Sequence, residues 1–233
     1  MLAVLRREFN SYFSSAIGYV YLVVFYVVTG IPFSLMMLSY STELAVVFSW
    51  TYSVLMFIVP ILTMRLLSED KKQKTDQALL TAPVNLSAIV LGKYFAAMAI
   101  FLIGIAVIVA YAVVLSIFAV IDWSVVLGSI LGIALLGAAL IAIGMFISSL
   151  TENQVIAAVG ALAISMVLMM LNVIISSLPV GFFQDLVSSI AFYNRYSPFT
   201  AGVLDVSNVL YFVSIAVVFN FLTMRVLEKR RWS

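Results

Sequence analysis

The sequence contains no cysteine and no histidine among its 233 residues. Disulfide bonds, thiol nucleophiles and histidine metal ligands are therefore excluded together. No GxxxxGK[ST] loop is present either, so the chain does not bind ATP by that route. A carboxylate-only metal site would need a tight acidic cluster, and none lies inside an apolar stretch. We expect no catalytic residue, no metal and no cofactor on this chain.

Charged residues are also scarce, at 9% of the chain, whereas soluble domains carry about 25%. Hydrophobic residues make up 65%, and the mean hydropathy is +1.22. This composition indicates a polytopic membrane protein in contact with a lipid bilayer. The formal net charge of +2 is small and gives no reason to expect a nucleic-acid partner.

Six stretches are long and apolar enough to cross a bilayer, which takes roughly 20 residues each. The expected fold is therefore an all-α polytopic membrane protein with six transmembrane helices in one domain, residues 1–233. Thr29, Gly30 and Pro32 predict a kink in the first span. The expected spans are residues 17–38, 44–64, 89–120, 125–147, 155–176 and 206–226.

The basic residues orient these spans, because Lys and Arg concentrate in short cytoplasmic loops. An even number of spans places both termini on one side. Only Arg195 then falls outside, so we predict a multi-pass protein of the cell membrane with both termini cytoplasmic. The other eleven basic residues fall inside: Arg6, Arg7, Arg65, Lys71, Lys72, Lys74, Lys93, Arg225, Lys229, Arg230 and Arg231.

Two segments between or before the spans are amphipathic or polar. Residues 1–15 predict an interfacial helix, in which Leu5 and Phe9 share a face and Arg6 and Arg7 point away. Residues 65–93 are the longest strongly polar interruption in the chain, and residues 66–88 form the segment between the second and third spans. Charged residues are costly inside a bilayer, so this segment is expected in the cytoplasm as one or two short helices.

A third such segment, residues 178–205, predicts an outer amphipathic or re-entrant hairpin broken at Pro198. Tyr193, Tyr196 and Phe199 within it are expected to form an aromatic belt at the membrane interface. Asp122 is interpreted as a solvated loop acid or a helix cap.

Polar and small residues inside the spans allow more than one interpretation. Small residues along the fourth span, from Gly128 to Gly144, permit either packing within the chain, which is favoured slightly, or a dimer seam. Asn172 and Asn220 are assigned to interhelical hydrogen bonds in preference to a substrate path. Three methionines are interpreted as core filler in preference to soft metal ligands: Met166, Met169 and Met170.

The polar segment resembles the cytoplasmic loop after the second span of ABC-2 type permeases. The loop Ser148–Gln154, SSLTENQ, resembles the inner loop after their fourth span. The closing run from Leu222 to Trp232 is similar to the gliding-motility or nitrous-oxide-reductase-accessory branch. Lys74 and Gln77 depart from the family pattern, which usually has glycine and glutamate there. The matching loop residues are Thr75, Leu79, Leu80, Pro83, Val84, Val90, Leu91, Gly92 and Lys93.

The resemblance implies a permease that pairs with a second permease, identical or paralogous, and with two separate ABC ATPase subunits. ATP and Mg²⁺ would bind to those ATPases. A coupling helix would dock on the ATPase through Glu69, Asp70, Lys71, Lys72, Thr75, Asp76, Gln77, Leu79 and Leu80. A second contact would use Thr151, Glu152, Asn153 and Gln154, and the interfacial gate helix would carry Arg6, Arg7 and Phe9.

Two other functions remain open from the sequence. One is a membrane anchor whose ATPase drives mechanical work on an outer partner without transport. The other is an ion-coupled carrier, which is disfavoured because no ionisable residue lies near the middle of any predicted span.

Overall fold

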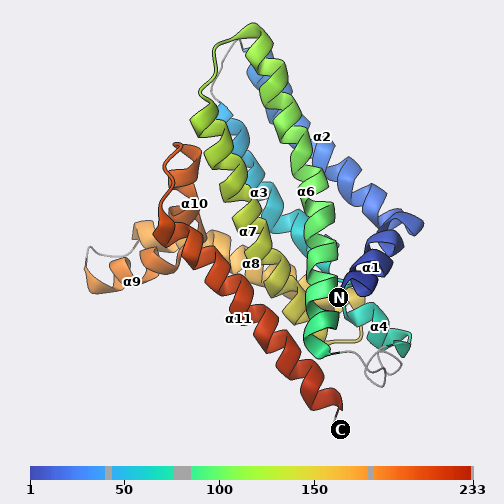
Figure 1. Cartoon of the computed structure of the whole chain (residues 1–233). Coiled ribbons are helices and arrows are strands. Elements are labelled where there is room, and N and C mark those ends of the chain that lie inside the picture. The colour runs from blue at the N-terminus through green and yellow to red at the C-terminus, as the bar shows by residue number, and fades with distance from the viewer. Residues whose placement is uncertain (40–43, 76–84, 178–180, 232–233) are drawn as a thin grey trace.

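The structure is a computed structural model that describes residues 1–39, 44–75, 85–177 and 181–231. The described part is helical (Figure 1). Its elements are α1 (Leu2–Ser14), α2 (Ala16–Leu38), α3 (Leu44–Thr63), α4 (Ser68–Lys72), α6 (Leu86–Phe118), α7 (Trp123–Leu150), α8 (Gln154–Ser177), α9 (Phe182–Ile190), α10 (Phe192–Thr200) and α11 (Val206–Arg231).

Six of the described helices are long and apolar enough to cross a membrane: α2, α3, α6, α7, α8 and α11. Helices α3 and α7 form the centre, because 61% and 67% of their most apolar stretches are buried. The corresponding share is 28% for α2, 22% for α11 and 11% for α8, so these helices lie outside. The chain is thus a helical bundle around an α3–α7 pair.

Both termini, α1 and α4 lie toward one end of the bundle, which we call the termini end (Figure 1). The α6–α7 turn lies at the opposite end. There Asp122 caps α7: its Oδ1 accepts hydrogen bonds from the Ser124 amide at 2.9 Å and hydroxyl at 2.7 Å. These hydrogen bonds lower the pKa of the Asp122 carboxyl. The interpretation of Asp122 as a helix cap is confirmed.

Small residues of α7 are used for packing inside the chain. A Cβ on Gly137 would lie 2.0 Å from Phe101 of α6, and one on Gly144 would lie 2.1 Å from Thr63 of α3. Contacts this short leave no room for a side chain. The favoured interpretation of the small-residue face, packing within the chain, is therefore confirmed.

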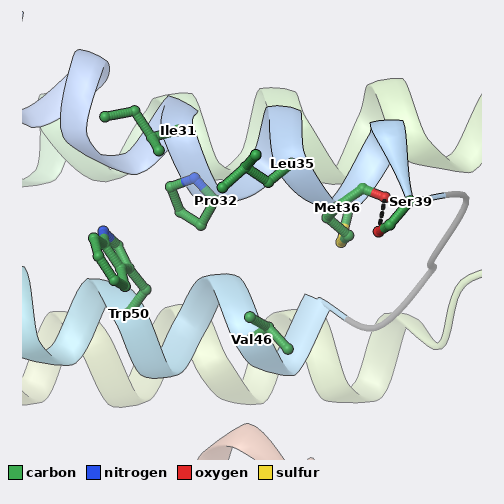
Figure 2. A pocket seen from close by; sticks show the side chains of 7 residues that line it. All are labelled: Ile31, Pro32, Leu35, Met36, Ser39, Val46 and Trp50. Carbon is green, nitrogen blue, oxygen red and sulfur yellow. Dashed lines mark hydrogen bonds between the residues drawn. The ribbon is translucent and has the colours of Figure 1, made fainter.

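Helix α2 runs without interruption through Pro32. Proline has no backbone N–H, so the Val28 carbonyl loses its usual partner one turn later. The indole Nε1 of Trp50 on α3 donates to this carbonyl at 3.2 Å. Pro32 and Trp50 face each other across an apolar cleft between α2 and α3 (Figure 2). The aromatic donor on α3 thus replaces the hydrogen bond that Pro32 removes from α2.

The segment after α8 differs from its prediction in two respects. The chain breaks at Ala191, between α9 and α10, whereas Pro198 lies inside α10. Tyr196 and Phe199 do not form an interfacial belt, because both are fully buried. The Tyr196 hydroxyl donates to the Phe48 carbonyl of α3 at 3.0 Å. Helix α10 therefore packs into the bundle, while every residue of α9 remains at least partly exposed.

Two further expectations about the spans are wrong. The side chains of Met166 and Met170 on α8 are 51% and 59% exposed, so they are not core filler. The Asn220 amide nitrogen donates to the Ala216 carbonyl of its own helix at 2.8 Å. The side-chain oxygens of Asn220 and Asn172 are buried with no hydrogen-bond partner in the described part of the chain. The predicted interhelical hydrogen bonds through these two oxygens are therefore not formed among the described residues.

Candidate functional site

The corner between α3 and α4 is held by one side chain from α7. The Ser148 hydroxyl accepts hydrogen bonds from the backbone amides of Leu67 at 3.1 Å and Ser68 at 3.0 Å. It also donates to the Met64 carbonyl at 3.0 Å. These amides are among the first of α4, where a helix has no backbone acceptors of its own. Ser148 therefore caps α4 from a distant part of the sequence.

Lys71 fixes the body of α4 to the same end of α7. Its side chain is only 6% exposed, and its ammonium group donates to the Ser149 carbonyl. The carbonyl end of a helix carries partial negative charge, which favours a cation there. Lys71 thus faces the protein's own α7 and not the solvent.

Lys93 on α6 joins α4 to α1. Its Nζ lies 3.0 Å from Glu8 Oε1 of α1 and 2.8 Å from Asp70 Oδ2 of α4. The Lys93 side chain is 1% exposed, so the ammonium group depends on these carboxylates for its stability. Beside it, Gly92 lets α1 approach, since a Cβ there would lie 2.9 Å from Val4 Cβ.

Arg65, just after α3, makes a second connection between α1 and α4. Its Nε lies 2.9 Å from Glu69 Oε2, and its terminal nitrogens donate to the hydroxyls of Ser15 at 2.7 Å and Ser11 at 2.9 Å. The guanidinium carbon lies 4.9 Å from the centre of the Tyr12 ring. These contacts hold the end of α1 against the start of α4.

Tyr12 completes the attachment of α1. Its hydroxyl donates to the Leu62 carbonyl of α3 at 2.9 Å, and its side chain is 1% exposed. Burial raises the pKa of Tyr12, and nearby Arg65 opposes this increase only in part. The hydroxyl therefore remains protonated and keeps donating throughout the physiological pH range.

These side chains surround a small polar cavity of about 220 Å³ at the termini end. We call the residues that line it the ion-pair hub: Arg7, Glu8, Ser11, Arg65, Glu69, Asp70, Gln73, Thr75 and Lys93. Its three basic and three acidic groups balance in charge. Arg7 lies 2.5 Å from Glu8, and this hydrogen bond raises the pKa of Arg7. The hub, Ser148 and Lys71 thus connect α4 directly to α1, α6 and α7.

The second predicted contact segment is organised by local hydrogen bonds. Asn153 Oδ1 accepts from the Val155 amide at 2.9 Å, which caps the start of α8, and Thr151 Oγ1 accepts from the Asn153 amide at 3.1 Å. Glu152 lies 3.0 Å from Arg230 at the end of α11. Gln154 is the first residue of α8. The segment thus lies between the ends of α7 and α11, beside α4.

The structure brings together only part of the predicted coupling segment. Glu69, Asp70 and Lys71 face the protein's own hub or α7. Thr75 lines the hub but is exposed, and Lys72 is exposed as well. The remaining predicted contact residues lie outside the described residues: Asp76, Gln77, Leu79 and Leu80. Docking of the whole segment on a partner stays a prediction.

The predicted gate helix α1 has an exposed basic edge. Arg6 and Arg7 are exposed, and Phe9 is partly buried with its ring centre 5.1 Å from that of Phe13. Lys93 of α6 pairs with Glu8 of α1, but the sequence placed it only at the inner edge of a span. Its position at the start of an apolar helix, within the Val-Leu-Gly-Lys run, is the signal that could have identified it as a hub residue.

The described residues contain no group of three or more Asp or Glu side chains placed to hold a metal ion. The contacts that the structure shows at this site are ion pairs and hydrogen bonds. They connect one short surface helix to three elements of the bundle.

Among the described residues, the α3–α7 pair and four further long apolar helices define a multi-pass helical membrane protein. A model of the ABC-2 family transporter proteins matches residues 35–232. The chain belongs to this family, as a membrane permease subunit of an ABC transporter. Permeases of this family work with ABC ATPase subunits, so the chain is a transport subunit and not itself catalytic. No curated protein matches the chain in sequence.

Proposed function

We propose that this permease pairs with a second permease and with two separate ATPase subunits to export an unidentified substrate. The observation that carries the proposal is the fixation of α4 by Ser148, Lys71 and Asp70. A five-residue surface helix has little stability alone, since short helices are marginal in water. Its multiple anchors suit an element that receives force from a partner and must not deform.

The anchors also suggest how a push on this helix would spread. Asp70 would move Lys93 and, through Glu8, the gate helix α1. The α1–α2 corner is tight, because a Cβ on Gly18 would lie 2.6 Å from the Tyr12 carbonyl oxygen. Motion of α1 would therefore pass to α2. We propose that ATP-driven approach of the ATPases tilts α2, α3 and α8 and opens a path between two bundles.

The termini end would face the cytoplasm in this proposal, where the ATPases and their ATP are. Eleven of the twelve basic residues belong to segments assigned to that side, which supports the orientation. The loop Thr151–Gln154 would be the second ATPase contact. The hairpin of residues 178–205 would cap the path on the outer side. Labelling of residues 69–80 from the outside would contradict this orientation.

The second permease would be an identical copy or a paralogue. The small-residue face of α7 is already occupied within the chain, so the two copies would pair through other helices. The branch proposed for this permease, the gliding-motility or nitrous-oxide-reductase-accessory group, rests on the closing run from Leu222 to Trp232.

The test is to replace Leu79 and Leu80 by Ala, because apolar anchors dominate docking energies. We expect the variant permease to retain less ATPase on purification and to lose substrate-dependent stimulation of ATP hydrolysis. The matched control replaces Ile117 and Phe118 by Ala at the other end of α6, where both are more than 70% exposed. Normal co-purification and coupling by the Leu79→Ala/Leu80→Ala variant would contradict the proposal.

The alternative is a membrane anchor whose ATPase performs mechanical work without transport. Purified complex in sealed vesicles separates the two functions, since only a transporter moves lipid, peptide or drug across the bilayer. An ion-coupled carrier would continue transport after ATP is removed. We expect transport that stops without ATP.

A further inference from the structure

A second cavity lies on the outside of the bundle, between α6, α7 and α11. It has a volume of about 430 Å³, within the range of small-molecule pockets. Its lining is almost wholly apolar. Phe95, Val217 and Phe221 line it and are 42%, 62% and 51% exposed, so it opens on the surface of the membrane protein. We call it the α11 groove.

One buried polar group in the α11 groove lacks a partner. Asn220 is 5% exposed, and its amide nitrogen is bound to the Ala216 carbonyl at 2.8 Å. Its side-chain oxygen has no hydrogen-bond partner among the described residues. A buried acceptor without a donor is costly, and such groups need an explanation such as an unseen ligand. Asn220 therefore marks this groove as different from the ordinary lipid-facing surface.

The other polar side chain in the groove also presents an acceptor. The Tyr94 hydroxyl donates its hydrogen to the Ala138 carbonyl at 3.1 Å, so its oxygen can offer a ligand only lone pairs that accept a hydrogen bond. A ligand that fills the groove and satisfies these acceptors must therefore carry a hydrogen-bond donor. The described residues that line it include no charged side chain, so an ionic ligand would be desolvated without compensation.

The position of Asn220 along α11 indicates how such a ligand would arrive. Asn220 lies five residues before Arg225, which corresponds to about 7.5 Å along a helix. Arg and Lys side chains prefer the membrane boundary. The unpaired oxygen is thus inside the apolar layer but close to its edge. A molecule that is already dissolved in the bilayer would reach it from the side.

We propose that the α11 groove binds a neutral, membrane-soluble molecule with a long apolar part and a single hydroxyl or N–H donor. The apolar part packs along α6 and α11. The donor binds Asn220 Oδ1, which is covered in this structure, so the Asn220 side chain turns toward the ligand when it binds. The α11 groove shares no lining residue with the ion-pair hub, and this proposal does not depend on how ATPases dock. A bare acyl chain would fill the volume but leave the oxygen without a donor.

The test uses two photoreactive probes that differ in one group. The purified full-length permease is placed in phosphatidylcholine vesicles with a diazirine-labelled hexadecanol or with the matching hexadecane. We expect the alcohol to label peptides around residues 91–95 and 213–224 about 3- to 10-fold more strongly than the alkane, which corresponds to one net hydrogen bond. Unlabelled hexadecanol should compete with this labelling.

The Asn220→Leu variant keeps a similar side-chain size and removes the unpaired oxygen. We expect it to lose the preference for the alcohol, while labelling by the alkane persists and shows that the groove is intact. The Asn172→Leu variant is the matched control, because it removes a similar unpaired oxygen from α8. It should keep the preference. Equal labelling by both probes, a preference that survives in Asn220→Leu, or exclusion of both probes by a second permease copy would overturn the proposal.

Discussion

Replacing Lys93 by Met removes the ammonium group that Glu8 and Asp70 share, while the long apolar stem of the side chain is kept. Each carboxylate oxygen is 3.0 Å or less from the same nitrogen, so the two oxygens lie within 6 Å of each other. Their side chains are only 12% and 17% exposed. The variant therefore leaves two largely buried negative charges facing each other without the cation between them.

The cost can be estimated from this geometry. Two unit charges about 5.5 Å apart repel by about 3 kcal/mol at an effective dielectric constant near 20. Breaking a buried ion pair by removing one partner typically costs about 3–5 kcal/mol. Arg7 still pairs with Glu8 at 2.5 Å and offsets part of this loss. We expect Lys93→Met to destabilise the permease by about 3 kcal/mol, which lowers the melting temperature by roughly 6–12 °C.

Thermal unfolding of the purified permease, followed by tryptophan fluorescence, measures this change. The control is Arg225→Met, which breaks an ion pair whose partners, Arg225 and Glu228, are 61% and 46% exposed. Exposed pairs contribute about 0–1 kcal/mol, so this control should change little. Adding Glu8→Gln and Asp70→Asn to Lys93→Met should recover most of the stability. The reasoning is refuted if Lys93→Met behaves like Arg225→Met, or if the neutral triple variant remains as unstable.

Two further predictions concern the backbone. Trp50→Phe should cost about 1–3 kcal/mol, because it leaves the Val28 carbonyl without the indole donor, and Pro32→Ala should restore much of this by returning a helical N–H. Additive effects in the double variant would contradict that account. Lys74 has a φ of 57°, so Lys74→Gly should stabilise the end of α4 by about 1 kcal/mol relative to Lys74→Ala in the same unfolding assay. A less stable glycine variant would show that the turn is not strained.

Much of the bundle could be predicted from the sequence, because the thickness of a bilayer fixes the length of a span. The first span was expected at residues 17–38, and α2 is Ala16–Leu38. The third was expected to start at residue 89, whereas α6 starts at Leu86. That difference has a physical reason: α6 begins directly after its N-cap, Asn85, and a helix can start before the apolar stretch that hydropathy detects.

The burial of α10 could not be predicted in the same way. Tyr and Phe serve equally well at a membrane interface and in a core, so their periodicity does not choose between the two. Glycines elsewhere in the sequence determine that α10 is buried in the core. A Cβ on Gly132 of α7 would lie 2.7 Å from Phe199 Cβ, so the glycine creates the space into which α10 packs. A single sequence does not show that Gly132 and Phe199 are neighbours in the fold.

The ion-pair hub could be predicted from the sequence only in part, for a related reason. The sequence showed mixed charges in residues 69–76 and a lysine at position 93, and it predicted solvent or a partner protein for the former. The structure pairs Asp70 with Lys93 over 23 positions of the chain and Lys71 with the end of α7. Long-range ion pairs of this kind depend on which helix ends meet, and periodicity does not encode that.

The internal neutrality of the hub decides which charges remain for long-range attraction. Glu8, Glu69 and Asp70 are neutralised by their own cations, whereas Lys72 and Lys74 on the same surface, like Arg6 on α1, are exposed. The described part of this surface is thus cationic to an approaching protein. A complementary partner would carry an acidic recess, and the rate at which it associates should fall as added salt shortens the reach of the field.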